Sequence, residues 1–239
     1  MIVKHLERGL IHYLYGNGAG KTSSSFGIVL RAIGNNLSPL IIQFLKESQV
    51  SPSEKKENQE FEIHGLDGLK IDISDIYREY TENMKDFLSK DKTNKSKQPN
   101  DEKKIPQWFN YGEFEVFNKV LHVPVIQLGT PRFIYTGEKP TRDQLLKTEF
   151  GLRIIERVLQ TDSYDVVVLD EIITAVFLKM VATERLVAIL KNRKPTIEVI
   201  LTGREKIAEL MDISDYITQF HEEKHPYNSG IMARKGIEF

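Results

Sequence analysis

The segment Tyr15-Gly16-Asn17-Gly18-Ala19-Gly20-Lys21-Thr22 decides the fold class of this 239-residue chain. It follows an apolar run, residues 10–14, and precedes a helix-like run, residues 23–33. A strand, a glycine-rich turn, Lys-Thr and a helix are the layout of a phosphate-binding loop, whose backbone N–H groups and helix N-terminus surround a polyphosphate. We expect this loop to bind a nucleoside polyphosphate through Gly16, Asn17, Gly18, Ala19, Gly20, Lys21, Thr22 and Ser23.

The spacing of the phosphate loop, residues 16–23, is irregular. The usual pattern has a glycine five residues before the Gly-Lys pair, and here that position is Tyr15. In such loops the lysine places a positive charge on the phosphates, and the threonine hydroxyl can hold Mg²⁺. The competing interpretation is a glycine-rich turn that binds nothing, and the flanking strand and helix argue against it.

The composition is that of an ordinary globular protein, with 40% hydrophobic and 28% charged residues. We expect one domain, residues 1–239. The net charge of −1 gives no reason to expect nucleic acid or an acidic membrane as a partner. The absence of cysteine excludes disulfides, thiolate catalysis and cysteine-ligated zinc. Residues 1–8 lack the apolar core of a secretory signal, and no run approaches ~20 apolar residues. The expected location is therefore the cytoplasm, with no membrane span.

Short apolar runs alternate with helical patterns along the chain, which predicts an α/β fold with a mostly parallel central sheet flanked by helices. The expected strands are residues 10–15, 39–44, 123–128, 165–169, 196–201 and 216–220. The expected helices are residues 21–33, 142–160, 183–191 and 205–211.

Residues 47–122 interrupt this alternation and are predicted to be an insertion. Apolar residues at helical spacing predict a helix over 73–88. Residues 89–104, SKDKTNKSKQPNDEKK, contain no apolar side chain and predict a flexible loop. One interpretation is a helical insertion packed on the sheet, and the other is a partner-binding arm.

Polar residues follow several of the expected strands, where ligands of open α/β sheets bind. Asp170 and Glu171 follow residues 165–169, and carboxylates there hold Mg²⁺ or its water in phosphate-loop proteins. The alternative is an acidic pair that only caps the next helix. Arg204 could neutralise phosphate charge. Phe133 and Tyr135 are either a stacking surface for a planar ligand or core residues of a short strand.

Together these motifs resemble the phosphate-loop ATP:corrinoid adenosyltransferases, over roughly residues 1–46 and 126–239. The displaced first glycine and the C-terminal segment are specific marks of that family. The matching pieces are Gly9-Leu10-Ile11-His12, Gly16 to Thr22, Leu30-Arg31-Ala32, Gln43-Phe44-Leu45-Lys46, Gly129-Thr130, Phe133, Tyr135, Val167-Val168-Leu169-Asp170-Glu171, Leu201-Thr202-Gly203-Arg204, Lys224-His225-Pro226-Tyr227, Gly230-Ile231, Ala233 and Lys235-Gly236-Ile237-Glu238-Phe239. The family usually has Trp at the position of Tyr135.

The resemblance implies a P-loop NTPase architecture of the RecA-like type and transfer of the 5′-deoxyadenosyl group of ATP to Co(I) of a corrinoid, cobalamin or cobinamide, in adenosylcobalamin biosynthesis or salvage. Lys21 and Arg204 would act on the leaving triphosphate, and Thr22, Glu171 and Asp170 would hold Mg²⁺. Phe133 and Tyr135 would displace the lower ligand of Co(II) before its reduction.

The resemblance also implies a reduced flavoprotein as electron donor and a homodimer. The alternatives are an ATPase or kinase of the same fold, and a non-catalytic ATP-binding module whose insertion recruits a partner.

Overall fold

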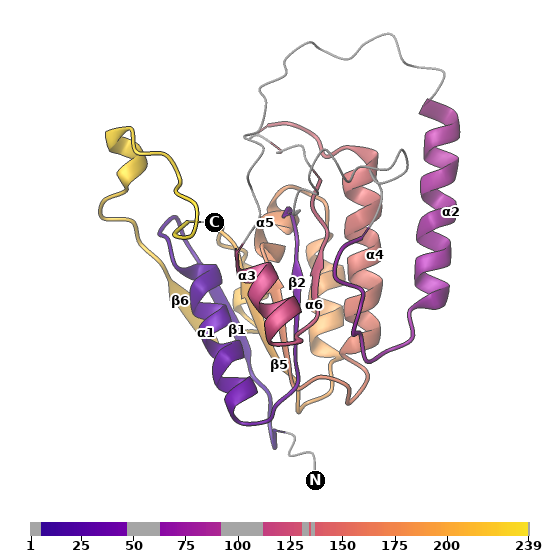
Figure 1. Cartoon of the computed structure of the whole chain (residues 1–239), viewed down its shortest axis with the longest axis horizontal. Coiled ribbons are helices and arrows are strands. Elements are labelled where there is room, and N and C mark those ends of the chain that lie inside the picture. Colours follow the sequence, from indigo (N-terminus) through magenta and orange to yellow (C-terminus); the bar gives the residue numbers. More distant parts are fainter. Residues whose placement is uncertain (1–5, 47–62, 92–111, 131–133, 135–136, 239) are drawn as a thin grey trace.

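A central sheet of six parallel strands organises the computed structural model, which describes residues 6–46, 63–91, 112–130, 134 and 137–238 (Figure 1). The strand order is β3-β2-β4-β5-β1-β6, and every strand pairing is parallel. The strands are β1 Ile11–Tyr15, β2 Pro39–Gln43, β3 Val125–Gln127, β4 Val166–Asp170, β5 Glu198–Thr202 and β6 Tyr216–Gln219. All six strands were predicted to within two residues, so the predicted parallel sheet is confirmed.

Helices cover both faces of the sheet (Figure 1). The α-helices are α1 Lys21–Gly34, α2 Ser74–Asp91, α3 Gly112–Glu115, α4 Arg142–Val158, α5 Ile172–Phe177, α6 Thr183–Lys191 and α7 Ala208–Met211. Helices α1 and α3 pack on one face, and α2, α4, α5 and α6 contribute to the core on the other. None of the helices in the described ranges is both long and apolar enough to cross a membrane.

The strand order places β5 between β1, which leads into the phosphate loop, and β4, which ends in Asp170. Because all strands run in the same direction, their C-terminal ends lie along one edge of the sheet. The phosphate loop, the β4–α5 turn and the segment after β5 therefore meet there, as expected of the P-loop NTPase fold.

Helix α2 lies in the segment predicted to be an insertion, where a helix was expected over residues 73–88. Residues 89–91 were expected to be loop and instead continue α2 to Asp91. The last turn is stabilised by contacts with Asp86: its carbonyl accepts a hydrogen bond from Ser89 Oγ at 2.8 Å, and its carboxylate pairs with Lys90 Nζ at 2.8 Å. Residues 92–104 of the predicted flexible loop lie outside the described residues.

The insertion packs on α4 through aromatic side chains. Tyr80 of α2 is buried, and its ring centroid lies 4.9 Å from that of Phe150 in α4. After the undescribed residues the chain forms α3 and a π-helical turn, η2 Val116–Val120, which were not predicted. Phe114 and Phe117 of this segment join the core beneath α1. Both described parts of the insertion thus contribute to the cores on the two sheet faces.

One predicted helix is shorter than expected for a tertiary reason. Residues 205–211 were predicted to be helical, but α7 covers only Ala208–Met211. The hydroxyl of Tyr13 in β1 donates a hydrogen bond to the Glu205 carbonyl at 2.9 Å and accepts one from the Ile207 N–H at 3.0 Å. These contacts accompany an extended backbone at Ile207, with φ −121° and ψ 107°, so the helix begins only at Ala208. The helix predicted over 142–160 ends at Val158, and α5 was not predicted.

Candidate active site

The phosphate loop connects β1 to α1 and is held against the segment that follows β6. The N–H of Gly18 donates a hydrogen bond to the Phe220 carbonyl at 3.0 Å, and Gly16 N–H donates to the Arg204 carbonyl at 3.2 Å. Tyr15 is buried, and its hydroxyl donates to Gln219 Oε1 at 3.0 Å. The tyrosine that replaces the usual first glycine is therefore part of the strand, and Gly16 begins the turn.

Gly16 to Ala is expected to destabilise the chain and weaken nucleotide binding. Gly16 has φ +120°, and a Cβ there would lie 2.2 Å from the Phe220 carbonyl oxygen. Both the backbone strain and the clash favour a loss of more than about 1 kcal/mol in the unfolding free energy. Gly27 to Ala is the matched control, because a Cβ at this α1 position has open space and helix propensity favours alanine. Urea unfolding of both variants checks this, and equal stabilities would contradict it.

Lys21 and Thr22 begin α1 and point into the site from the end of the loop. Gly20, with φ 102°, occupies the N-cap position and turns the chain into the helix. Lys21 is buried, and its Nζ donates a hydrogen bond to the Gly18 carbonyl at 2.7 Å. No acidic residue lies in the first helical turn. The helix N-terminus and Lys21 therefore present positive charge to an anion in the loop.

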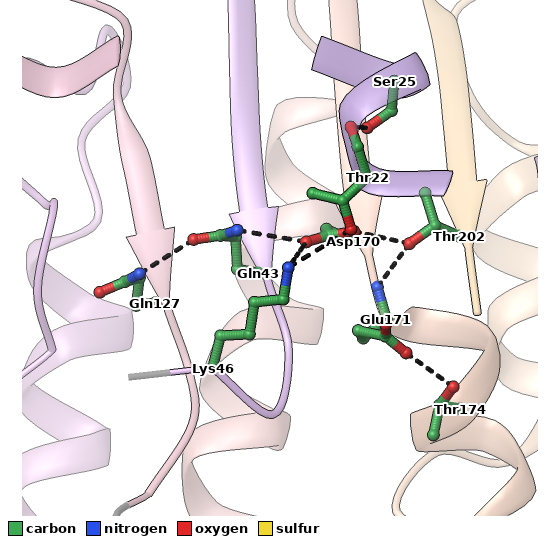
Figure 2. A network of polar contacts seen from close by, with 9 residues as sticks. All are labelled: Thr22, Ser25, Gln43, Lys46, Gln127, Asp170, Glu171, Thr174 and Thr202. Atoms are coloured by element: carbon green, nitrogen blue, oxygen red, sulfur yellow. Dashed lines mark hydrogen bonds and ion pairs between the residues drawn. The ribbon is translucent and has the colours of Figure 1, made fainter. Parts of the chain in front are cut away.

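The Asp170 carboxylate at the end of β4 is fully buried and forms the centre of a polar network (Figure 2). Its Oδ1 accepts hydrogen bonds from the hydroxyls of Thr22 at 2.9 Å and Thr202 at 2.7 Å. Its Oδ2 accepts one from Gln43 Nε2 at 3.1 Å and lies 2.8 Å from the ammonium of Lys46. One carboxylate thus joins α1, β2, β4 and β5.

Glu171 follows Asp170 in a left-handed conformation, with φ 61°. Its N–H donates a hydrogen bond to Thr202 Oγ1 at 2.9 Å, and its carboxylate accepts one from Thr174 Oγ1 at 2.8 Å (Figure 2). Glu171 occupies the N-cap position of α5, yet its side chain makes no capping hydrogen bond. The geometry therefore does not support the interpretation of the acidic pair as a simple helix cap.

The two carboxylates have opposite electrostatic environments. Burial opposes ionisation of Asp170, but the adjacent Lys46 ammonium and the hydrogen bonds from Thr202 and Thr22 together lower the pKa of Asp170 below its ordinary value. Burial likewise opposes the charge of Lys46, and Asp170 outweighs it and raises the pKa of Lys46. Burial and the neighbouring Asp170 charge raise the pKa of Glu171. A cation arriving beside these carboxylates would relieve their mutual repulsion.

Replacing Glu171 by Gln is expected to remove a pH-dependent loss of stability. The folded-state pKa of Glu171 is raised above its ordinary value of 4.5. As the pH rises between those two values, the folded state holds more protons than the unfolded state, so the unfolding free energy falls. The Gln variant keeps an acceptor for Thr174 and lacks this titration. Its stability advantage over the wild type should therefore grow as the pH rises from 4.5 through the raised folded-state pKa of Glu171, in ligand-free urea unfolding. A difference constant across that range would contradict the prediction.

Buried amides extend the network across the sheet edge. Gln127 of β3 donates a hydrogen bond through Nε2 to Gln43 Oε1 at 2.9 Å, and Gln43 in turn donates to Asp170 (Figure 2). Gln43, Lys46 and Thr202 were recognised in the sequence only as residues near strand ends and were given no role. Their position at the C-terminal ends of β2 and β5 was the available signal.

Two cavities lie at this edge and share a wall. The nucleotide cavity, of about 540 Å³, is lined by the phosphate loop and by Gly112, Glu113, His225, Gly236, Ile237 and Glu238. The second cavity, of about 460 Å³, is called the apolar cavity after its side chains Leu45, Leu128, Ile134, Phe177, Leu178 and Met180. It is also lined by Gly129 and by the polar residues Thr130, Gln144, Thr174 and Glu205. Lys46, Glu171 and Arg204 line both cavities. Ligands in the two cavities would therefore be neighbours.

The structure brings most of the predicted site residues together. Lys21, Thr22, Glu171 and Arg204 all line the nucleotide cavity, and Asp170 is hydrogen-bonded to Thr22. Asn17, Gly18, Ala19, Gly20 and Ser23 line it as well. Phe133 and Tyr135 lie outside the described residues, so their predicted roles stay predictions. Ile134, between them, is described and lines the apolar cavity.

Buried Lys147 of α4 contacts a segment that lines the apolar cavity. Its Nζ donates a hydrogen bond to the Gly129 carbonyl at 2.9 Å, and Gln144 Nε2 donates to Thr130 Oγ1 at 3.0 Å. These contacts fix the segment after β3 against α4. Sequence reasoning missed Lys147, whose position inside a helical pattern resembles an ordinary surface lysine.

Thr22, Asp170 and Glu171 offer hydroxyl and carboxylate oxygens, the ligands that hard divalent cations prefer. In the described ranges, no three His, Cys, Asp or Glu side chains gather closely enough to hold a metal. This set therefore fits a cation that completes its coordination with phosphate oxygens and water, and does not fit a metal enclosed by protein alone.

Comparisons with known proteins agree with this geometry. The family described as ATP:corrinoid adenosyltransferase BtuR/CobO/CobP matches residues 7–107 and 102–239. A corrinoid adenosyltransferase of Sinorhizobium is 24% identical over 100% of this chain and 84% of its own length. Corrinoid adenosyltransferase CobA of Salmonella typhimurium is 23% identical over 98% of this chain and 87% of its own.

Among solved structures, a KaiC-like protein of Pyrococcus horikoshii is similar over 91% of this chain and 75% of that chain, with a TM-score of 0.40 and 14% identity. The family match spans both the nucleotide cavity and the apolar cavity and covers nearly all of the described residues. This chain therefore belongs to the ATP:corrinoid adenosyltransferase family.

Proposed function

We propose that this chain transfers the 5′-deoxyadenosyl group of ATP to the Co(I) centre of a corrinoid and releases triphosphate. The observation that carries the proposal is the wall of Lys46, Glu171 and Arg204 shared by a phosphate-binding cavity and an apolar one. In this reaction cobalt supplies the electron pair of the new cobalt–carbon bond. The C5′–O5′ bond breaks, and its pair leaves with the triphosphate.

The phosphate loop stabilises the leaving triphosphate. As the C5′–O5′ bond breaks, negative charge grows on the triphosphate oxygen, and preorganised donors there lower the barrier. Lys21 turns from the Gly18 carbonyl to the phosphates, and the backbone N–H groups of the loop and α1 complete the contact. Arg204 neutralises charge at the boundary of the two cavities.

Mg²⁺ bound with ATP would supply further positive charge to the triphosphate, and Thr22, Asp170 and Glu171 are the residues that would hold it. No water has to be activated, so the carboxylates serve the metal and not a hydrolytic step.

The apolar cavity receives the corrinoid macrocycle. Leu128, Phe177 and Met180 supply apolar surface, and Gly129 with Thr130 supplies backbone and hydroxyl groups. Following the family resemblance, Phe133 and Tyr135 fill the lower face of the corrinoid and displace the lower ligand of Co(II). The proposal also includes a reduced flavoprotein as electron donor, a homodimer and a cytoplasmic location.

Tyr135 to Ala is expected to raise the barrier to Co(II) reduction, because the lower face would then admit a ligand that stabilises Co(II). Transfer from chemically prepared Co(I) corrinoid should fall much less, since that cobalt is already reduced. The measurement compares the variant and the wild type with flavoprotein-reduced and with prereduced corrinoid. Unchanged reduction of Co(II) by the variant would exclude this role.

Absorbance spectroscopy of Co(I) corrinoid with ATP and Mg²⁺ tests the proposed function. We expect a light-sensitive alkylcobalt product and one equivalent of triphosphate per corrinoid. ADP and phosphate without an alkylcobalt product would instead establish an ATPase or kinase. ATP binding with neither product would establish a non-catalytic module.

A further inference from the structure

The ammonium of Lys46 already occupies the place at which a cation would join the phosphate loop to β4. Its Nζ lies 2.8 Å from Asp170 Oδ2 and 3.3 Å from Thr22 Oγ1 (Figure 2). Thr22 and Asp170 are two of the residues that would hold Mg²⁺ in the proposed function, on which this inference rests. A lysine ammonium and a metal ion cannot both take these oxygens.

Asp170 has little remaining capacity for a metal. A carboxylate offers about four acceptor positions on its two oxygens. Hydrogen bonds from Thr22, Thr202 and Gln43 and the Lys46 ammonium use all of these positions. A cation can bind this carboxylate directly only if one of the four partners leaves.

Lys46 is the partner that a bound nucleotide can draw away from Asp170. Thr202 belongs to β5 and also accepts a hydrogen bond from the Glu171 N–H, and Gln43 belongs to β2 and also accepts one from Gln127. Lys46 follows β2, and its charged group stands on a flexible four-carbon stem. It also lines both cavities, so its ammonium can turn toward a bound triphosphate while its backbone stays in place.

We propose that Lys46 is a substitute cation that holds the metal position before nucleotide binds. Its ammonium neutralises the buried Asp170 and holds Thr22 beside the end of β4. In the complex with ATP and Mg²⁺, the Asp170 and Thr22 oxygens would hold the cation, and the Lys46 ammonium would turn to the triphosphate. The exchange disfavours binding of metal alone, because metal without nucleotide would displace the Lys46 ammonium from Asp170 and bring no phosphate to receive it.

Binding of Mn²⁺, as a paramagnetic replacement for Mg²⁺, tests the exchange without any turnover. Electron paramagnetic resonance titrations in the absence of nucleotide would compare the wild type, Lys46→Met and Lys147→Met. Lys147 is the matched control, because it is also a buried lysine but contacts a carbonyl oxygen away from Asp170. We expect Lys46→Met to bind Mn²⁺ about tenfold or more tightly than the other two proteins. Equal Mn²⁺ affinity of Lys46→Met and the wild type would overturn the proposal.

Thermal unfolding of the same proteins gives a second readout. Without metal, both variants should melt below the wild type, since each loses a buried contact. Saturating Mn²⁺ should restore the melting temperature of Lys46→Met by about 5 °C or more and leave Lys147→Met and the wild type unchanged. Destabilisation of Lys46→Met without recovery by Mn²⁺ would show a purely structural lysine.

If Lys46→Met does not fold, the wild type can still overturn the proposal, because the exchange requires weak binding of Mn²⁺ in the absence of ATP. Equally tight Mn²⁺ binding without ATP would contradict the exchange. A wild type that binds no ATP would instead contradict the proposed function itself, so the two failures are distinguishable.

Discussion

Replacing Lys21 with Ala is expected to slow adenosyl transfer from ATP to Co(I) corrinoid by about 10²- to 10³-fold, the usual effect of removing one donor from a charge-stabilising site. Lys21 is the buried cation at the start of α1, and its ammonium lies 2.7 Å from a carbonyl of the phosphate loop. Burial lowers its pKa, which the negative charge of Glu171 partly offsets. A triphosphate would favour its charged form further. The rate of alkylcobalt formation at saturating ATP measures the loss.

Lys206 to Ala is the control for this prediction. Lys206 is exposed, and its ammonium lies 5.5 Å from the centroid of the Tyr15 ring, close to the loop but not among the residues that line either cavity. The Lys206 substitution removes the same positive charge as the Lys21 substitution from nearly the same region. Long-range electrostatics should therefore affect both variants alike. We expect the Lys206 variant to keep its rate within about twofold. Similar losses for both variants would show that Lys21 acts only through the general field.

Asp170 to Asn should lower the unfolding free energy by about 3–5 kcal/mol, the range expected when a buried ion pair loses one partner. Asp170 is fully buried, and the substitution leaves the Lys46 ammonium without its carboxylate. The amide also turns two N–H groups toward the donors Thr22 and Thr202 or toward Gln43 and Lys46. For a chain of this length the melting temperature should fall by roughly 10 °C. Calorimetry of the ligand-free protein measures the change.

The double variant Asp170→Asn with Lys46→Met separates the ion pair from the other contacts of Asp170. If the unpaired ammonium causes most of the damage, the double variant should be no less stable than Asp170→Asn alone. Additive losses in the two single variants would mean that Asp170 acts through Thr22, Thr202 and Gln43, and that its charge matters little.

Local patterns in the sequence predicted most of the secondary structure. The apolar runs of β1, β2, β4 and β5 and the loop between β1 and α1 are each specified by neighbouring residues, and the structure confirms them. One failure occurred where a distant contact intervened, and another where a local side-chain contact outweighed composition. The hydroxyl of Tyr13 holds residues 205–207 out of the helix predicted there. The contacts of Ser89 and Lys90 with Asp86 extend α2 into a stretch that composition alone predicted to be loop.

The site shows the same division between local and distant contacts. The phosphate loop was identifiable because glycines, a lysine and a threonine at fixed spacing have few other uses. No role could be assigned to Lys46 from the sequence, because its partner Asp170 is 124 residues away in the chain. Gln43 and Gln127 could be placed near strand ends, but a buried link to Asp170 requires β2 to lie between β3 and β4. The roles predicted for Phe133 and Tyr135 stay predictions.

The sequence by itself determined that this chain has a phosphate loop on a parallel α/β sheet, because the pattern of a glycine turn between a strand and a helix is visible in adjacent residues. Tertiary structure alone decided that Asp170 is buried between Thr202, Gln43 and Lys46, and that nucleotide and apolar cavities share a wall. The physical reason is that strand order is set by packing of apolar faces from distant segments, and that order selects which polar side chains meet at the sheet edge.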